Sequence, residues 1–331
     1  MIAWVIEKEN GKRTLQMREL PSLKPGRAEL KVDVYYAGIN RADLLQLYGL
    51  YPQPGPPTSF EIPGLEFSGR ICQIGEGVEG WKEGDPVFGL LIGGAFSTEV
   101  VVHERFLLPI YGRLSFVEAA AIPETFFTAW DGLEYRAQAK ENETLLISAA
   151  GSGVGLSALA LANLKNLKVF GMVRSPAKKE KLLKVGAVDV FTEGQTDLID
   201  WSLTRTGGKG MDIIFDLVGG ERFSQYLQIA AEKGRILSLG LLAGSKTEIS
   251  LIHLLRKRLT LVGSTLRARP MEEKMFLTQE FRKKILPFFI EGRLKPIIDR
   301  IFLWDQLKEA LQYLEENRHF GKILLKVKEE K

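Results

Sequence analysis

The sequence predicts an α/β protein with two domains, a small β-barrel-like domain and a doubly wound parallel sheet. The chain has 331 residues, more than one hydrophobic core usually serves. Residues 1–122 follow the pattern of strands and turns, whereas apolar strands alternate with helical patterns over residues 123–265. That alternation is typical of a parallel sheet covered on both faces. Residues 266–331 are expected to return to the first domain, which would then be discontinuous.

The elements of the first domain follow from residue alternation and from the turn residues. Apolar and polar residues alternate at 29–36 and 96–102, as in half-buried strands. A helix is expected at 41–47, with Asn40 as its N-cap, and the prolines of 51–57 mark a loop. The returning tail should form two amphipathic helices and a last strand, at 271–291, 304–317 and 321–326.

The second domain should contain a series of short strands separated by helices. Helices are expected between them, among others at 154–163, 176–185 and 198–205. The expected strands lie at 144–149, 168–173, 188–191, 212–218, 235–240 and 259–264.

Composition and charge exclude several classes of protein. Hydrophobic residues make up 45% and charged residues 26%, and the net charge of +4 is spread along the chain, so nucleic-acid binding is not expected as a main role. The single cysteine, Cys72, excludes an intrachain disulfide and a cysteine-rich zinc lobe. No signal peptide and no apolar run long enough to span a bilayer is expected, which favours a cytoplasmic protein away from membranes.

A glycine-rich turn at 149–155 lies directly between a predicted strand and a predicted helix. Small residues there let the backbone approach a pyrophosphate, and the free N–H groups of the helix start attract an anion. Any tight turn favours glycine, but the position at the head of the strand series favours a dinucleotide. Ser152, Gly153 and Val154 are therefore candidate cofactor contacts.

The end of the second strand of this domain distinguishes the two nicotinamide cofactors. NAD-binding proteins usually carry an acid there, which binds the ribose hydroxyls. This chain has Arg174 and Ser175 instead, followed by Lys178 and Lys179. A guanidinium, a hydroxyl and an ammonium suit a 2′-phosphate, so NADPH is the expected cofactor. Lys179 is better interpreted as part of a solvated helix face.

Several further motifs lie along the chain: Ala37–Asp43, Tyr48–Pro52, Pro63–Glu66, Ile74–Val78 and Gly219–Gly220, besides the 149–155 turn. Together they resemble the medium-chain dehydrogenase/reductase superfamily, in its zinc-independent, zeta-crystallin-like quinone oxidoreductase branch. The resemblance implies a GroES-like catalytic domain, a Rossmann domain, and homodimers that pair through the edge strand 259–264.

This chain departs from the zinc-dependent members of the superfamily at both metal ligands. They place a cysteine within the segment 38–40 and a histidine at position 65, where this chain has Gly-Ile-Asn and Leu65. The resemblance therefore implies chemistry without a metal. Two further departures concern the cofactor: Ser152 replaces a glycine of the phosphate turn, and Glu193 stands where several NADPH-binding relatives have a tyrosine.

The resemblance also implies which residues approach the nicotinamide. Asn40, Asp43 and Tyr51 would be catalytic, with Tyr48 nearby, and Tyr51 aligns with the proton-donating tyrosine of enoyl-thioester reductases. The alternative is that Tyr48 and Tyr51 only anchor the loop. Further cofactor contacts are implied at Thr128, Gly240, Leu241, Leu242, Leu266, Arg267 and Lys322.

The implied activity is the NADPH-dependent reduction of a quinone or another small conjugated carbonyl compound, such as an enone. An enoyl-thioester reductase is the alternative, and would need a wide basic cleft for its substrate arm. A cofactor-binding structural or regulatory protein is a third interpretation, against which the intact polar set Asn40, Asp43 and Tyr51 argues.

Overall fold

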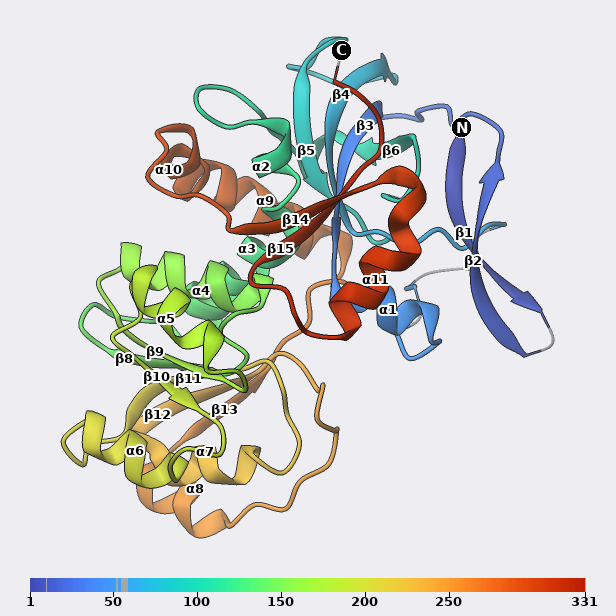
Figure 1. Ribbon diagram of the computed structural model, residues 1–331. Coiled ribbons are helices and arrows are strands. Elements are labelled where there is room, and N and C mark those ends of the chain that lie inside the picture. Colours follow the sequence, from blue (N-terminus) through green and yellow to red (C-terminus); the bar gives the residue numbers. More distant parts are fainter. Residues whose placement is uncertain (10, 52, 55–58, 331) are drawn as a thin grey trace. The chain divides into compact units, whose positions relative to one another are not determined.

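The computed structural model describes residues 1–9, 11–51, 53–54 and 59–330. The chain forms two compact units: unit 1 consists of Met1–Phe127 and Leu266–Lys331, and unit 2 of Thr128–Thr265 (Figure 1). The boundary expected between residues 122 and 123 lies just before helix α3 (Pro123–Trp130). Unit 1 continues into this helix, which the strand pattern of the first domain did not indicate.

Unit 1 is built on a seven-stranded sheet that joins both segments of the chain. The strand order is β14-β15-β3-β4-β5-β7, with β6 also paired to β3. The returning strand β15 pairs antiparallel with β3, which brings Ile323 opposite Ile39. A separate antiparallel pair is formed by β1 (Ile2–Glu9) and β2 (Lys12–Glu19). The strands of the large sheet are β3 (Glu29–Ile39), β4 (Glu66–Ile74), β5 (Pro86–Leu90), β6 (Glu99–His103), β7 (Leu107–Pro109), β14 (Ile298–Leu303) and β15 (Lys322–Lys326).

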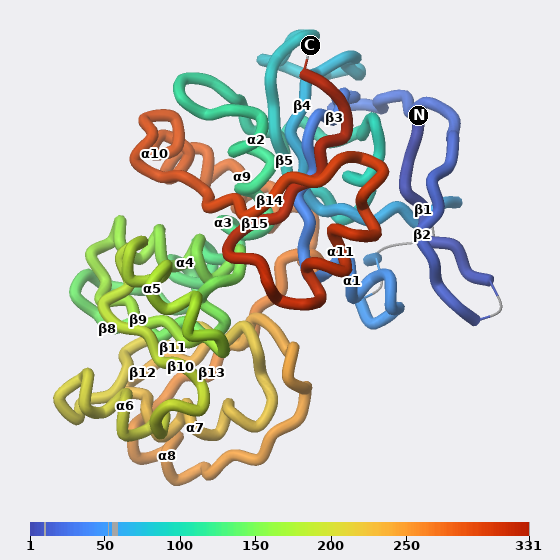
Figure 2. The backbone as a smooth tube through the Cα atoms, viewed as in Figure 1, coloured from blue at the N-terminus to red at the C-terminus, as the bar shows by residue number. Residues whose placement is uncertain are grey.

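The core of unit 1 packs this sheet against a helix from the returning tail. Leu30, Val32 and Val34 alternate along β3 and are fully buried. Helix α11 (Leu307–Glu315) lies beside α1 (Arg41–Leu47), as Figure 2 shows. It buries residues at helical spacing, so one face completes the core. These residues are Leu307, Ala310, Leu311 and Leu314.

Unit 2 is a six-stranded parallel sheet in the order β10-β9-β8-β11-β12-β13. Helices α4 and α5 lie on one face and α6, α7 and α8 on the other (Figure 1), which is the doubly wound arrangement expected from the sequence. The strands are β8 (Thr144–Ile147), β9 (Lys168–Val173), β10 (Asp189–Thr192), β11 (Met211–Asp216), β12 (Ala230–Ser238) and β13 (Thr260–Gly263). The helices are α4 (Gly153–Leu164), α5 (Ala177–Lys184), α6 (Leu198–Arg205), α7 (Phe223–Ile229) and α8 (Leu251–Lys257).

The structure differs from the sequence prediction in its shorter elements. The helix expected at 271–291 is two helices, α9 (Met271–Lys284) and α10 (Leu286–Ile290). Pro287 occupies the first turn of α10, because proline has no N–H to continue the preceding helix. Strand β14 and helix α8 were not predicted. The remaining short elements are η1 (Glu104–Phe106), α2 (Phe116–Ala119), η2 (Asp131–Arg136) and η3 (Trp304–Gln306).

Candidate functional site

The start of helix α1 is fixed by a buried aspartate. Asp43 accepts hydrogen bonds from the backbone N–H of Asn40 at 2.7 Å and of Gly64 at 3.0 Å. The two bonds tie the helix start to the loop before β4. Burial raises the pKa of Asp43 to about 6, although these N–H donors and the cations Lys322 and Arg267 oppose the shift. Both Asp43 oxygens are thus used within the protein.

A buried ion pair holds the side chain of Asn40. Lys322 donates to Glu66 at 2.5 Å, to Asn40 Oδ1 at 2.8 Å and to the Ile39 carbonyl at 3.0 Å. Asn40 in turn donates through Nδ2 to Glu66 at 2.8 Å. The side chains of Lys322 and Glu66 are 4% and 0% exposed. An ammonium has three N–H donors, and these three bonds use all of them, so Lys322 has a structural role in unit 1. The cofactor contact expected of Lys322 stays a prediction.

The carboxylate of Glu66 fills the space beside the segment 38–40. A side chain at Gly38 would clash with Glu66, which explains why glycine is needed there. The ion pair thus lies next to the position where the zinc-dependent members of the superfamily have their cysteine. Within the described residues, no group of three or more His, Cys, Asp and Glu side chains is arranged to hold a metal ion.

Glu124 is a second carboxyl next to this pair, and the sequence had not singled it out. Its backbone N–H donates to Glu66 at 2.8 Å. Burial, together with the carboxylates Glu66 and Asp43, raises the pKa of Glu124 to about 8, although Lys322 and Arg267 oppose the shift. The side chain therefore keeps its proton at neutral pH. An acid in the first turn of a helix is common, so the sequence carried no signal for this environment.

Tyr51 lies against a buried arginine. The guanidinium carbon of Arg267 is 5.3 Å from the centre of the Tyr51 ring, and Nη1 donates to the Tyr51 carbonyl at 3.3 Å. Burial raises the pKa of the Tyr51 phenol, Glu124 adds to this, and Arg267 opposes it. The carbonyl of Arg267 accepts from Lys274 at 3.1 Å. The side chain of Arg267 thus contacts Tyr51, and the backbone approach to the nicotinamide expected of Arg267 stays a prediction.

Tyr48 is placed differently from Tyr51. Its hydroxyl donates to Glu315 at the end of α11, at 2.7 Å, and its side chain is exposed. This bond joins α1 to α11, so the anchoring interpretation fits Tyr48. Unit 1 thus contains a buried network in which hydrogen bonds join Asn40, Asp43 and Lys322. The charges of Lys322 and Arg267 both act on Asp43, and Tyr51 lies half-buried against Arg267.

In unit 2 the glycine-rich turn leads directly into helix α4. Ser152 is the N-cap of this helix, and its hydroxyl accepts from the Gly155 N–H at 3.1 Å. A side chain at Gly155 would lie 2.7 Å from the Ala150 carbonyl, so glycine is required there. Gly153 and Val154 form the first turn and are partly exposed. The start of this 12-residue helix is suited to bind a pyrophosphate.

The edge of the sheet next to this turn carries exposed cations. Arg174 and Ser175 follow β9 and are exposed, with the half-buried Lys178 in α5. The backbone N–H of Glu193 donates to the last residue of β9, Val173, at 3.0 Å, so this acid lies beside them. Its carboxylate is paired with Arg222 at 3.4 Å. Arg222 was missed from the sequence because only the sheet order brings it to Glu193.

The other expected cofactor residues lie at strand ends and at the passages between units. Leu241 and Leu242 follow β12 and are exposed, and a side chain at Gly240 would meet the Leu217 carbonyl at 2.5 Å. Thr128 opens unit 2 in helix α3, and Leu266 is buried at the start of the second segment of unit 1.

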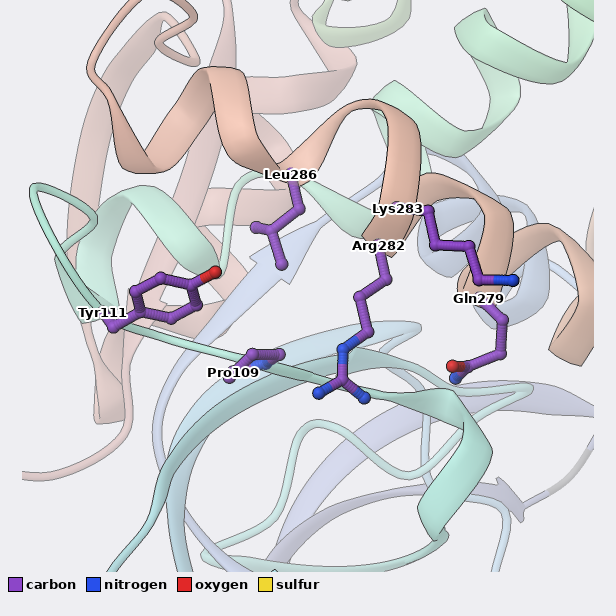
Figure 3. A pocket seen from close by; sticks show the side chains of 6 residues that line it. All are labelled: Pro109, Tyr111, Gln279, Arg282, Lys283 and Leu286. Atoms are coloured by element: carbon purple, nitrogen blue, oxygen red, sulfur yellow. The ribbon is translucent and has the colours of Figure 1, made fainter. Parts of the chain in front are cut away.

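A hollow of about 430 Å³ in unit 1 lies away from these residues (Figure 3). None of the predicted site residues lines it, so we do not place the site there. Its lining residues come from α9, α10 and the segment at the end of β7: Pro109, Tyr111, Gln279, Arg282, Lys283 and Leu286. In the described part of the chain no helix is both long and apolar enough to cross a membrane.

Comparison with known proteins identifies the family. Residues 26–112 match the alcohol dehydrogenase GroES-like domain and residues 153–282 the zinc-binding dehydrogenase family. The chain is 33% identical to a quinone oxidoreductase-like protein 2 homolog of Nematostella vectensis, over 92% of this chain and 83% of that protein.

Solved structures give the same result. The Escherichia coli quinone oxidoreductase complexed with NADPH superposes with a TM-score of 0.88 and 26% identity, covering 99% of this chain and 100% of that one. The JamJ enoyl reductase superposes with a TM-score of 0.86 and 26% identity, covering 98% of both chains.

The chain belongs to the medium-chain dehydrogenase/reductase superfamily, in its quinone oxidoreductase branch. Unit 1 contains the GroES-like domain and unit 2 is the parallel-sheet Rossmann domain, which confirms the predicted fold class. The family and its structural neighbours make this chain an oxidoreductase and imply a nicotinamide cofactor.

The buried ion pair leads to a prediction on stability. Replacing Lys322→Met leaves the Glu66 carboxylate buried without its cation, so the free energy of unfolding of unit 1 should fall by about 3–5 kcal/mol. Chemical denaturation, with calorimetry as a second method, would measure this loss of stability. Adding Glu66→Gln to that variant should recover part of the loss, because a neutral amide is easier to bury.

Lys328→Met provides the control, since Lys328 forms a partly exposed ion pair with Asp33 at 3.0 Å. Its removal should change stability by less than about 1 kcal/mol. Equal losses for the two lysine variants would contradict the structural role assigned to Lys322.

Proposed function

We propose that this protein uses NADPH to reduce quinones or other small conjugated carbonyl compounds, without a metal ion. The observation that carries the proposal is the half-buried Tyr51 phenol, held against the Arg267 guanidinium, in a chain of the quinone oxidoreductase branch. The quinone oxidoreductase-like relatives support the substrate class.

Tyr51 is the residue to which we assign the chemistry. When bound, the nicotinamide cofactor supplies a hydride equivalent to the electrophilic carbon of the substrate. Negative charge then develops on the substrate oxygen, and a positioned donor lowers the barrier by stabilising it. A phenol is neutral at pH 7 and can donate a hydrogen bond or a proton to that oxygen.

Asn40 and Asp43 have another role in this proposal than the catalytic one that the resemblance implies. The polar atoms of both side chains are hydrogen-bonded within the protein, to Glu66, Lys322 and backbone N–H groups. We assign them to positioning helix α1, from which the chain continues to Tyr51. Asn40 and Asp43 then affect the reaction indirectly, through the position of Tyr51 in the segment that follows α1.

The absence of a metal requirement is supported by the side chains beside the segment 38–40. The Lys322–Glu66 pair occupies this region, and Leu65 is fully buried. A buried ammonium and a leucine are not metal ligands. The stabilisation of the substrate oxygen is therefore assigned to the Tyr51 hydroxyl.

The preference for NADPH rests on the charges beside strand β9. We assign the binding of a 2′-phosphate to Arg174, Ser175 and Lys178, whose guanidinium, hydroxyl and ammonium suit such a group. The acid that would repel it, Glu193, is paired with Arg222. We propose further cofactor contacts at Ser152, Gly153, Val154, Thr128, Gly240, Leu241, Leu242 and Leu266.

An enoyl-thioester reductase is the second candidate. It is supported by the superposition with the JamJ enoyl reductase and by the tyrosine donor, which an enoyl substrate would need. Rates of NADPH oxidation with quinones, enones and acyl thioesters would separate the two functions. Turnover confined to acyl thioesters would replace the first proposal by the second.

We also propose a homodimer that forms through the free edge of the unit 2 sheet. Strand β13 lies at this edge, and large apolar side chains are exposed on it and on α8, among them Leu251, Leu255 and Leu261. An exposed strand edge with apolar residues is a template for pairing with a second chain.

We also propose a cytoplasmic location, which the single cysteine supports.

The first functional prediction concerns Tyr51→Phe. Losing one positioned donor should lower kcat with an enone about 100-fold, while the affinity for NADPH stays nearly unchanged. The loss should be small with a quinone of high reduction potential, which accepts hydride with little help. Steady-state assays with an enone and with a quinone would measure both effects. The enzyme is first treated with a chelator, and this treatment should itself leave the activity intact. Unaltered kcat with both acceptors would leave Tyr51 with a structural role only, as an anchor of its loop.

The second functional prediction concerns the cofactor. NADPH should bind at least tenfold more tightly than NADH, a difference of about 1.4 kcal/mol, and Arg174→Ala should remove most of this preference. Fluorescence titration with both cofactors would measure it. Lys168→Ala, at the opposite end of the same strand, is the matched control and should keep the preference. Equal affinities of the unmodified protein for NADPH and NADH would contradict the proposed preference for NADPH.

The third prediction concerns assembly. Leu255→Glu places a charge in the exposed apolar face of α8 and should convert the dimer to monomers, which sedimentation velocity would detect. Leu183→Glu, an exposed leucine on the other face of the sheet, should leave the dimer intact. A monomeric unmodified protein would contradict the proposed dimer.

A further inference from the structure

Arg267 is a buried cation that donates to three uncharged oxygens within the described part of the chain. Arg267 as a whole is only 3% exposed. Nε donates to the Ile92 carbonyl at 2.8 Å, Nη1 to the Tyr51 carbonyl at 3.3 Å and Nη2 to Gln46 Oε1 at 2.7 Å. Burying a cation is costly unless it is hydrogen-bonded, and these acceptors meet that need without neutralising the charge. The guanidinium therefore keeps its positive charge, which acts electrostatically on neighbouring groups.

The three acceptors belong to separate segments of unit 1. Gln46 lies in α1, Tyr51 in the segment that follows it, and Ile92 after β5. One planar side chain thus fixes the position of the Tyr51 backbone relative to two other elements. Its guanidinium carbon also lies 5.3 Å from the centre of the Tyr51 ring, within the range of a cation–π interaction.

Building on the proposed role of Tyr51, we propose that Arg267 is a positioning residue that orients the Tyr51 phenol and promotes the release of its proton to the reduced substrate. In that step the phenol O–H bond breaks, its electron pair stays on Tyr51 as phenolate, and the proton goes to the enolate. The reductant is the nicotinamide cofactor of the proposed function. Solvent water later returns a proton to Tyr51.

Two charged groups act on the phenol in opposite directions. The cation of Arg267 stabilises the phenolate, whereas Glu124 of α3 disfavours it when it is ionised. Behind Arg267, the Lys274 ammonium donates to its carbonyl and is itself buried. Because Glu124 keeps its proton at neutral pH, the effect of Arg267 should dominate there.

A double-mutant cycle tests this coupling. Arg267→Met should lower kcat with an enone about tenfold, leave kcat with a high-potential quinone within about twofold, and increase the solvent deuterium isotope effect on the enone reaction. In a Tyr51→Phe background the same replacement should have almost no further effect on the enone reaction. Arg267→Lys, which keeps the charge but loses the planar fork, should show a smaller loss and remains testable if the methionine variant does not fold.

Arg13→Met is the matched control. Arg13 also anchors the end of α1, through the Leu47 carbonyl at 3.0 Å and Glu61, but does not contact Tyr51 in the described structure. It should leave the ratio of enone to quinone turnover unchanged. The inference fails if a folded Arg267 variant lowers both activities equally, or if its loss is undiminished in the Tyr51→Phe background. If Tyr51→Phe alone has no effect on either acceptor, the donor role assigned to Tyr51 in the proposed function is overturned, whatever the Arg267 variants show.

Discussion

The buried ion pair between Lys322 and Glu66 is the interaction on which the arrangement of unit 1 depends. It joins the returning strand β15 to β4, and through Asn40 and the Glu124 N–H it also reaches the starts of α1 and α3. Such a pair is unfavourable to bury unless every donor and acceptor is satisfied. That requirement restricts β15 to one register against β3, because any shift would leave a buried charge without its partner.

The same network determines where the site can be chemically active. Burial raises the pKa values of Asp43 and Glu124, and the two cations Lys322 and Arg267 act against both shifts. The polar atoms of Asn40 and Asp43 are used inside this network. The proposed chemistry is therefore concentrated on Tyr51 at its edge, and the surrounding charges serve to position that phenol and adjust its acidity.

The cofactor-binding unit depends on a simpler constraint, the parallel sheet order. Because β9 and β10 are neighbours, their ends bring Arg174 close to Glu193. The salt bridge to Arg222, at the start of α7, then offsets the acid that had argued against a 2′-phosphate. The charge of Glu193 alone therefore does not describe the electrostatics at the end of β9, because its salt-bridge partner comes from a distant part of the chain.

The sequence by itself determined the fold class, the helix after Asn40, the glycine turn and nearly every strand of unit 2, because periodicity and turn chemistry are local properties. It also indicated the family, and it singled out Tyr51. Tertiary structure alone decided the partners of Lys322 and Arg267, the raised pKa of Glu124 and the pairing of Glu193. These properties depend on burial and on contacts between residues far apart in the chain, such as Glu66 with Lys322 and Gln46 with Arg267, and no local pattern encodes them.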